Sequence, residues 1–362
     1  MSKLTVGVLV EEDVAGVVGL IAAQEARLVA LDDRLCPPHG REQLNILVHL
    51  EEMLESDRRP EMEPVVVRDG DRVRGYVQPG LWEVAAGSTA ACFFPPCTGL
   101  AYHMTLPPPD APDYAVVAEA LLDALDERWA VMGTEGEVVG WPSRDGRLAP
   151  LLTARGFVPD SVLAVRANTP SLSLCASELR TRRAHRADED TLVALYLEEI
   201  EFHAERAPFT WRVEDLAVGF RVALAQAWAC ASVEDHAPLL VVVERGGEIV
   251  GMAETYIEYV KRGRSYLPPG RYGYLNNVAV REDCRGQGVG RVLVAGALTE
   301  LAALGVDGFY LYYLAANGLA AGFWPRVGFE PLVTRYQRRR CPPQHDDAAM
   351  PELAGVSGPR KL

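Results

Sequence analysis

Apolar residues recur at helical spacing after the glycine-rich segment near residue 288, and this is the most regular periodic pattern of the chain. Val294, Leu298 and Leu301 stand at positions i, i+4 and i+7, with Arg291, Thr299 and Glu300 off that stripe. Such a stripe is typical of a helix that packs one face on a core. We therefore predict a helix over residues 288–304 with one buried face.

The residues around this helix alternate between short apolar runs and further helical segments. Apolar runs flanking a turn with glycines indicate a β-hairpin. The predicted order is a strand, a helix pair (190–231), a hairpin (239–260), a strand (274–280), a helix (288–304), a strand (308–314), a helix (318–327) and a strand (329–337). This order favours the α/β class, built as an α+β mixed sheet flanked by helices.

The chain contains this series of elements twice. EEDVAGVVGL (11–20) corresponds to DEDTLVALYL (188–197), PVVVRDGDRVRGYV (64–77) to LVVVERGGEIVGMA (240–253), and DGRLAPLLTARGFVP (145–159) to NGLAAGFWPRVGFEP (317–331). The members of the three pairs begin 177, 176 and 172 residues apart, and they keep the same order. A repeat of this length indicates two tandem domains of one fold.

The composition of the intervening segments suggests where the domains meet. We predict a first domain at 1–168, a linker at 169–179, a second domain at 180–340 and a mobile tail at 341–362. The linker is rich in serine, and the tail is rich in proline without periodicity.

Charge and composition exclude several classes of protein. The 362 residues carry a formal net charge of -14, which argues against a general nucleic-acid binder because such proteins need a basic footprint. Acidic residues appear too early for a signal peptide, and we expect no apolar run long enough to span a membrane. The seven cysteines are scattered, as free thiols in a reducing compartment would be. We expect a soluble cytoplasmic protein without metal, either a monomer or a homodimer.

The segment REDCRGQGVGRVLV (281–294) joins the predicted strand to the predicted helix and has the features of an anion site. Free N–H groups at a helix start, together with the helix dipole, favour a negative ligand. Glycines allow close approach of the backbone, and Arg285 could add a planar fork for phosphate oxygens. The segment matches neither the dinucleotide fingerprint nor the Walker loop.

The longer segment YLNNVAVREDCRGQGVGRVLV resembles the acetyl-CoA-binding motif of the GNAT acetyltransferase superfamily, in which a strand runs into R/Q-x-x-G-x-G/A. In this chain that motif is formed by Arg285, Gly288 and Gly290. A second superfamily signature, N-x-x-A-x-x-x-Y-x-x-x-G-F, is nearly complete at Asn317, Ala320, Trp324, Gly328 and Phe329. The resemblance covers about residues 180–337.

The resemblance implies an acyl-CoA-dependent N-acyltransferase that uses acetyl-CoA or another acyl-CoA and acts on a primary amine of a small molecule or peptide. It implies that backbone N–H groups of 287–290 hold the pyrophosphate and that the strand at 278–280 pairs with the pantetheine arm. The residues expected to bind the coenzyme are Val278, Ala279, Val280, Arg285, Gly286, Gln287, Gly288, Val289, Gly290, Asn317 and Trp324.

The first domain lacks the phosphate loop. Its corresponding segment, TLPPPDAPDYAVV (105–117), contains prolines, which offer no N–H, and the acids Asp110 and Asp113. We therefore expect one catalytic domain and one degenerate domain, an arrangement that resembles mycothiol synthase in architecture alone.

A general base is expected because a lysine-like amine, with a pKa near ~10.4, is mostly protonated at neutral pH. Glu254 and Glu258 lie four apart on a predicted strand and face the same side. The pairing with the pantetheine arm needs the strand to part from its neighbour near residue 279, and Glu254 is closer to that point, so we prefer Glu254. The alternative is that both acids lie on a solvated hairpin face. His203 could also act as a base, or it could be a surface helix histidine.

Trp324 stands where the second signature has tyrosine, the residue that the resemblance implies would protonate the leaving thiolate. Indole donates a hydrogen bond but gives up no proton at working pH. Tyr313 is our candidate donor in its place, with Tyr310 and Tyr312 on the other face of the same strand. Trp324 itself is expected to be packing and pocket wall.

Three readings of the function remain open. The first is the N-acyltransferase, with cationic acceptors mildly favoured by the acidic balance. The second is a non-catalytic module that senses acyl-CoA, and the third is an aminoacyl-tRNA-dependent transferase on the same fold. The basic loop at 261–273 is either a lid over the acceptor site or a plain extension of the hairpin.

Overall fold

A computed structural model describes residues 4–36, 43–55, 59–169, 178–210, 213–229, 237–261 and 266–340. Most of the predicted linker and all of the predicted tail lie outside these residues. The fold is a mixed, mostly antiparallel sheet flanked by helices, which confirms the predicted class.

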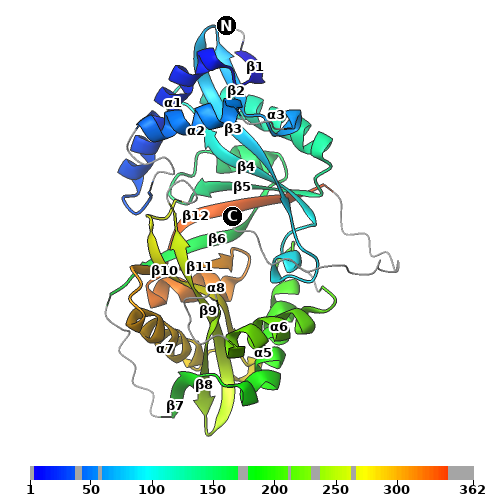
Figure 1. Cartoon of the computed structure of the whole chain (residues 1–362), viewed down its shortest axis with the longest axis vertical. Helices are drawn as coiled ribbons and strands as arrows, with labels where there is room; N and C mark the ends of the chain where they lie inside the picture. The colour runs from blue at the N-terminus through cyan, green and yellow to red at the C-terminus, as the bar shows by residue number, and fades with distance from the viewer. Residues whose placement is uncertain are drawn as a thin grey trace.

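The described strands form one sheet of twelve, in the order β1-β2-β3-β4-β5-β12-β6-β11-β10-β9-β8-β7 (Figure 1). The strands are β1 (Leu4–Val8), β2 (Val65–Asp69), β3 (Arg72–Glu83), β4 (Cys97–Thr105), β5 (Gly136–Pro142), β6 (Val158–Ala167), β7 (Leu179–Arg183), β8 (Leu239–Arg245), β9 (Glu248–Val260), β10 (Gly270–Val280), β11 (Gly308–Leu314) and β12 (Glu330–Arg339). The helices are α1 (Val14–Leu31), α2 (Gln43–Glu55), α3 (Tyr114–Met132), α4 (Ala149–Ala154), α5 (Glu189–Ala204), α6 (Leu216–Ala229), α7 (Val289–Ala303) and α8 (Gly318–Phe323).

The repeat found in the sequence is present element by element, so that β1–β6 form a first half and β7–β12 a second half. Each half opens with the same cap: the Val10 N–H donates to Asp13 at 3.0 Å, and the His185 N–H donates to Asp188 at 2.8 Å. Helices α1 and α5 follow these caps directly.

The two halves exchange their last strands. β6, which ends the first half, pairs with β11, and β12, which ends the second half, pairs with β5. β6 and β12 also pair with each other, antiparallel, at the middle of the sheet. The sheet is therefore continuous, and each half is completed by a strand of the other.

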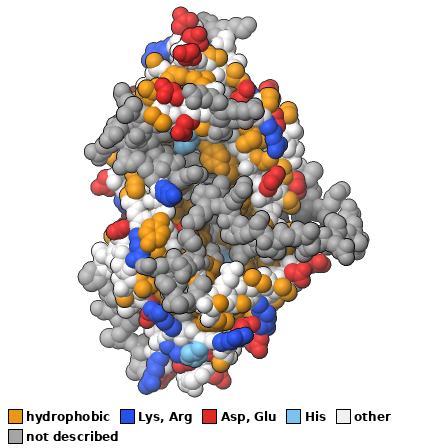
Figure 2. Space-filling model, in the orientation of Figure 1, with side chains coloured by type: hydrophobic (Ala, Val, Ile, Leu, Met, Phe, Trp, Pro, Cys, Tyr) orange, Lys and Arg blue, Asp and Glu red, His pale blue; other side chains and the backbone are white. Residues whose placement is uncertain are grey.

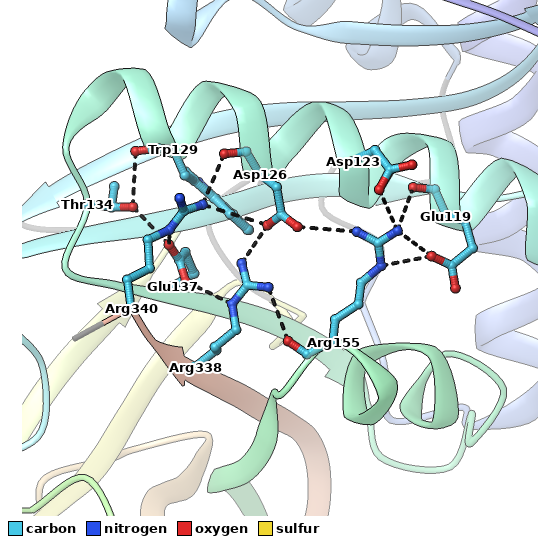
Figure 3. Close-up of polar contacts among 9 residues, drawn as sticks. All are labelled: Glu119, Asp123, Asp126, Trp129, Thr134, Glu137, Arg155, Arg338 and Arg340. Atoms are coloured by element: carbon cyan, nitrogen blue, oxygen red, sulfur yellow. Dashed lines mark hydrogen bonds and ion pairs between the residues drawn. The ribbon is translucent and has the colours of Figure 1, made fainter. Parts of the chain in front are cut away.

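An ion-pair network fixes the exchanged strand β12 to the first half (Figure 3). Arg338 Nε lies 3.1 Å from Glu137 Oε2 on β5, and Arg338 Nη2 lies 2.5 Å from Asp126 on α3. Arg340 also pairs with Glu137. The Glu137 side chain is fully buried, so its charge depends on both arginines.

Replacing Glu137 with alanine should therefore lower the free energy of unfolding by about 3 kcal/mol, because it leaves two partly buried arginines without their carboxylate. Urea unfolding measures this loss. Glu119 gives the control: it belongs to the same network through Arg155, but its side chain is 40 % exposed. The Glu119→Ala change should cost less than about 1 kcal/mol. Equal losses in the two variants would contradict this role of Glu137.

Helices cover both faces of the sheet (Figure 1). On β2, Val66 packs toward α1 and α2, while the alternate residues Val65 and Val67 pack toward α3. On β8, Val242 packs toward α5 and α6, while its neighbours pack toward α7. Val333 and Gln337 lie on the same face of β12. Val333 packs with α1, and the Gln337 side chain donates to the carbonyl of Phe93, which packs beside α5 and α6. The pairs α1–α2 and α5–α6 thus share one face, which we call the acceptor face.

One helical segment corrects the expectation that no apolar run is long enough to span a membrane. Glu11–Leu31 has 21 residues and passes that test by length and composition alone. In this fold Val17, Ile21 and Leu28 of the segment are buried against the sheet, and 28 % of its apolar window is buried. It serves here as a covering helix of the first half.

Candidate active site

The turn between β10 and α7 presents unpaired backbone amides. Gly286 has φ 75° and Gly288 has φ 84°, and a Cβ added at either would meet nothing within 4 Å. The first helical donors with a partner are those of Arg291 and Val292, both bonded to the Gly288 carbonyl. The amides of 286–290 donate to no group in the described part of the chain, so they are available to an anion with open space above them.

Arg285 holds this turn in place. Its Nε donates to the Val280 carbonyl at 2.9 Å, its Nη2 pairs with Glu198 on α5 at 2.8 Å, and its guanidinium lies 4.4 Å from the centre of the Phe202 ring. Glu198 also accepts the N–H of Glu282 at 2.7 Å. The guanidinium predicted to meet phosphate oxygens is thus already engaged in shaping the loop.

The strands next to the turn part from each other, as the sequence led us to expect. β10 pairs with β11 only from Tyr272 to Leu275, while its pairing with β9 continues to Val280. A β-bulge between Leu275 and Asn277 marks the point of separation. Residues 276–280 therefore have one edge that no described strand covers, which is the geometry that an added extended chain needs.

Glu254 lies on β9 directly opposite the bulge, paired in register with Asn277. Its side chain is 3 % exposed. Tyr256 Oη donates to its Oε1 at 2.6 Å and Asn276 Nδ2 donates to its Oε2 at 2.8 Å. Burial raises the pKa of the Glu254 carboxyl, the two hydrogen bonds act to lower it, and the charge of Glu199 raises it further.

Tyrosines extend from Glu254 along the acceptor face. Tyr274 Oη donates to Asn276 at 2.9 Å, its ring stacks on that of Tyr310 at 4.7 Å, and the ring of Tyr312 is 6.4 Å away. Tyr256, Tyr274 and Tyr310 keep part of their surface accessible, yet burial is the largest cause of the raised pKa of each hydroxyl. These half-buried side chains form a row across neighbouring strands, which we call the tyrosine row.

The first half supplies part of the wall beside Glu254. Phe93, from the segment between β3 and β4, lies 6.3 Å from the ring of His203, and Thr89 bonds Tyr196 at 2.9 Å. His203 Nε2 lies 3.3 Å from Glu199, and its side chain is only 16 % exposed. His203 is thus no surface histidine: it lies between the halves, and the charge of its partner Glu199 reaches Glu254.

Three other predicted site residues lie toward α7. Tyr313 and Trp324 pack with the α7 core cluster, on the face opposite Glu254, so the structure does not bring Tyr313 to the base. Trp324 is 8 % exposed and lies 5.0 Å from Phe323, ring to ring. Asn317 caps α8 by accepting the Ala320 N–H at 3.2 Å.

The corresponding slot of the first half is closed. Register places Met104–Leu106 where the second half has Val278–Val280, and the side chain of Gln24 bonds both ends of that stretch: its Nε2 donates to the Met104 carbonyl, and its Oε1 accepts the Leu106 N–H, each at 2.9 Å. Asp113 stands at the start of α3, paired with Arg74 at 2.5 Å, where the second half has its open amides.

The first half also lacks the carboxylate. Gln78 occupies the place of Glu254, since it lies two residues after Tyr76 on β3, as Glu254 lies two residues after Met252 on β9, and Tyr76 and Met252 pair with corresponding residues of β4 and β10. Within the described residues no three His, Cys, Asp or Glu side chains gather as a metal site. The sequence analysis did not single out Tyr256, Asn276, Glu199 or Gln24. The 176-residue offset of the repeat aligns Gln78 with Glu254, so the loss of the carboxylate in the first half could have been found from the sequence.

Several basic side chains of the described residues are paired with acids. Basic side chains gather at the end of the molecule that carries β7 and β8 (Figure 2), but Arg182 pairs with Asp188 and Glu244, and Arg183 pairs with Glu300. In the loop at 261–273, residues 262–265 lie outside the described residues. Leu267 packs with Leu28 of α1.

Comparisons with known proteins agree with this geometry. Residues 190–329 match the family model described as "Acetyltransferase (GNAT) family". A GCN5-related N-acetyltransferase from Sphaerobacter thermophilus shares 14 % identity at a TM-score of 0.51, covering 94 % of this chain and 96 % of its own. A glucosamine N-acetyltransferase region of a fungal multi-domain β-N-acetylglucosaminidase shares 15 % sequence identity at a TM-score of 0.50. The match covers 93 % of this chain and 38 % of that protein. A tandem GNAT protein from the clavulanic acid biosynthesis pathway shares 14 % sequence identity at a TM-score of 0.44, and the match covers 94 % of this chain and 100 % of that protein. No curated protein sequence matches the chain.

Proposed function

We propose that this chain is an acyl-CoA-dependent N-acyltransferase with one catalytic site, in the second half, because residues 190–329 match the model of the GNAT acetyltransferase family. The donor we propose is acetyl-CoA, and the acceptor is a primary amine of a small molecule or peptide that attacks the thioester directly. The single observation that carries the proposal is the turn of unpaired amides at 286–290 beside an uncovered strand edge, next to a buried carboxylate.

The residues present fit the coenzyme. The glycines leave room over the amides, Arg285 fixes the turn, and the uncovered edge of 276–280 offers backbone groups to an extended arm. When bound, the coenzyme supplies an activated acyl thioester. The closed slot of the first half, with Gln24 and Asp113 in the corresponding places, offers neither feature.

Glu254 would take the proton from the acceptor amine. A carboxylate with a pKa above its usual range is a better base near neutral pH, and burial produces that rise here. Tyr256 and Asn276 each donate to one carboxylate oxygen and so fix its orientation, while each oxygen keeps a lone pair. His203 contacts Glu199, and the charge of Glu199 helps to raise the pKa of Glu254.

Trp324 would act through packing rather than proton transfer, so Trp324→Phe should retain most of the turnover. Its ring is buried among Phe323 and Phe329, and phenylalanine preserves that contact. A thiol with a pKa near ~8.5 gains only about 2 kcal/mol from protonation at pH 7, so the thiolate can leave unaided. The kcat for thiol release measures this. A thousandfold fall in kcat with unchanged unfolding would give the indole a chemical role.

A thiol-release assay with acetyl-CoA and a panel of amines tests the proposed function. We expect thiol release that depends on both substrates and is insensitive to ribonuclease. Tight binding of acetyl-CoA without thiol release from any amine would instead support a non-catalytic sensor. Loss of activity with ribonuclease would support an aminoacyl-tRNA donor.

A further inference from the structure

Arg335, on β12, carries a guanidinium whose donors are largely unused. Its Nη2 donates to the Tyr312 hydroxyl at 2.9 Å, and its guanidinium carbon lies 4.0 Å from the centre of the Tyr312 ring. Guanidinium has five N–H donors in a planar fork. Among the described residues, no carboxylate lies within ion-pair distance of Arg335, although the side chain is half-buried.

Other arginines of the same strand are committed to structural contacts. Arg338 and Arg340 point to the opposite face and pair with Glu137 and Asp126 (Figure 3). Arg339 donates to the carbonyls of Phe93 and Phe209. Arg335 differs from them because no carboxylate of the described residues contacts it. The buried Asp160 interacts with its charge only from beyond ion-pair distance, so most of the N–H donors of Arg335 stay available to a ligand.

The guanidinium of Arg335 lies at the end of the tyrosine row opposite Glu254. Its positive charge reaches Tyr274 and Tyr310, where it opposes the rise that burial causes in the pKa of their hydroxyls. From Tyr312 the row continues through Tyr274 and Asn276 to Glu254. Tyr312 on β11 and Glu254 on β9 are two strands apart, and two inter-strand spacings amount to roughly 10 Å.

We propose that Arg335 binds an oxyanion of the acceptor, so that the acceptor class is an amine with a carboxylate or phosphate roughly 10 Å from the nitrogen that is acylated. The amine lies at Glu254, the oxyanion lies on the open edge of Arg335, and the tyrosines contact the atoms between. Planar, bidentate recognition of this kind suits both oxyanions. The inference rests on the proposed function, and it argues against purely cationic acceptors such as polyamines.

Two matched tripeptides test the proposal, because an extended three-residue chain spans about 10 Å. Triglycine carries the terminal carboxylate and triglycinamide carries none. Calorimetry on the protein saturated with CoA should give a dissociation constant for triglycine at least about tenfold lower than for triglycinamide. In Arg335→Gln the two constants should become equal through weaker binding of triglycine, and Arg335→Lys should restore part of the difference.

Arg326→Gln is the control, since it removes the same charge from an exposed position after α8. It should leave the preference intact. Competition with inorganic phosphate and with acetate then separates the two oxyanions, as the better competitor identifies the group that the site takes. The proposal would be overturned if the unaltered protein bound the two peptides equally or bound neither. It would also be overturned if Arg335→Gln lost the binding of both peptides together. If one of these results is found while the protein still releases thiol with neutral amines, the assignment of Arg335 fails and the proposed function stands.

Discussion

Replacing Glu254 with glutamine should lower kcat by about 100-fold to 10,000-fold, the usual contribution of a positioned general base. Glutamine keeps the shape of the side chain and one acceptor oxygen, but it cannot take a proton. The dissociation constant for acetyl-CoA should stay within about twofold, because Glu254 lies on the acceptor face of β9 and the amides lie in the turn after β10. Stopped assays of thiol release, with acetyl-CoA binding measured separately, give both numbers.

The pH profile of the same variant distinguishes a base from a structural carboxylate. Burial raises the pKa of Glu254 above the ordinary value of a glutamate, so the carboxylate that accepts the proton is present only above that raised pKa. The rate should therefore rise with pH as Glu254 loses its proton, and this limb should disappear in Glu254→Gln. Glu258, on the same face of β9 and half-exposed, supplies the matched control. If Glu258→Gln were the slower variant, the base would be assigned to the wrong carboxylate.

Replacing Gly288 with alanine should weaken acetyl-CoA binding by about 100-fold. Gly288 has φ 84°, a conformation that costs a residue with a Cβ about 1–2 kcal/mol, and the added methyl would stand in the open space above the amides. Loss of even two charge-assisted hydrogen bonds from displaced amides accounts for a change of this size. Equilibrium binding of acetyl-CoA measures it.

Gly246 separates backbone strain from ligand binding. It lies in the turn between β8 and β9 with φ 60°, and a Cβ there also meets nothing within 4 Å. Gly246→Ala should cost similar stability and leave acetyl-CoA affinity unchanged. Should the two variants weaken binding alike, the turn at 286–290 is not where the coenzyme is held.

Local pattern was sufficient for several elements of the second half and for the glycine-rich turn before α7. The strand predicted at 308–314 is β11 to the residue, and the helix predicted at 288–304 is α7 within one residue at either end. These segments succeed because their apolar spacing, their glycines and their caps all favour one structure. The position of Glu254 beside the strand separation follows from the same local pattern, since the hairpin register places it opposite Asn277.

The exchange of β6 and β12 could not be predicted in this way. Either strand could pair with its own half or with the other, because the two halves repeat one pattern of alternating apolar residues. The choice depends on distant side chains, such as Glu137 and Asp126 meeting Arg338. The same limit applies to the site: Gln24 is bonded to residues 80 and 82 positions away, and Arg335 contacts a tyrosine from another strand.

A crystal structure with bound acetyl-CoA tests the central claim most directly. The account predicts one coenzyme per chain, with its pyrophosphate on the amides of 286–290 and its extended arm along the uncovered edge of β10, while the slot beside Gln24 and Asp113 holds none. A coenzyme bound in the first half, or a turn at 286–290 left without ligand while acetyl-CoA is bound elsewhere, would contradict it.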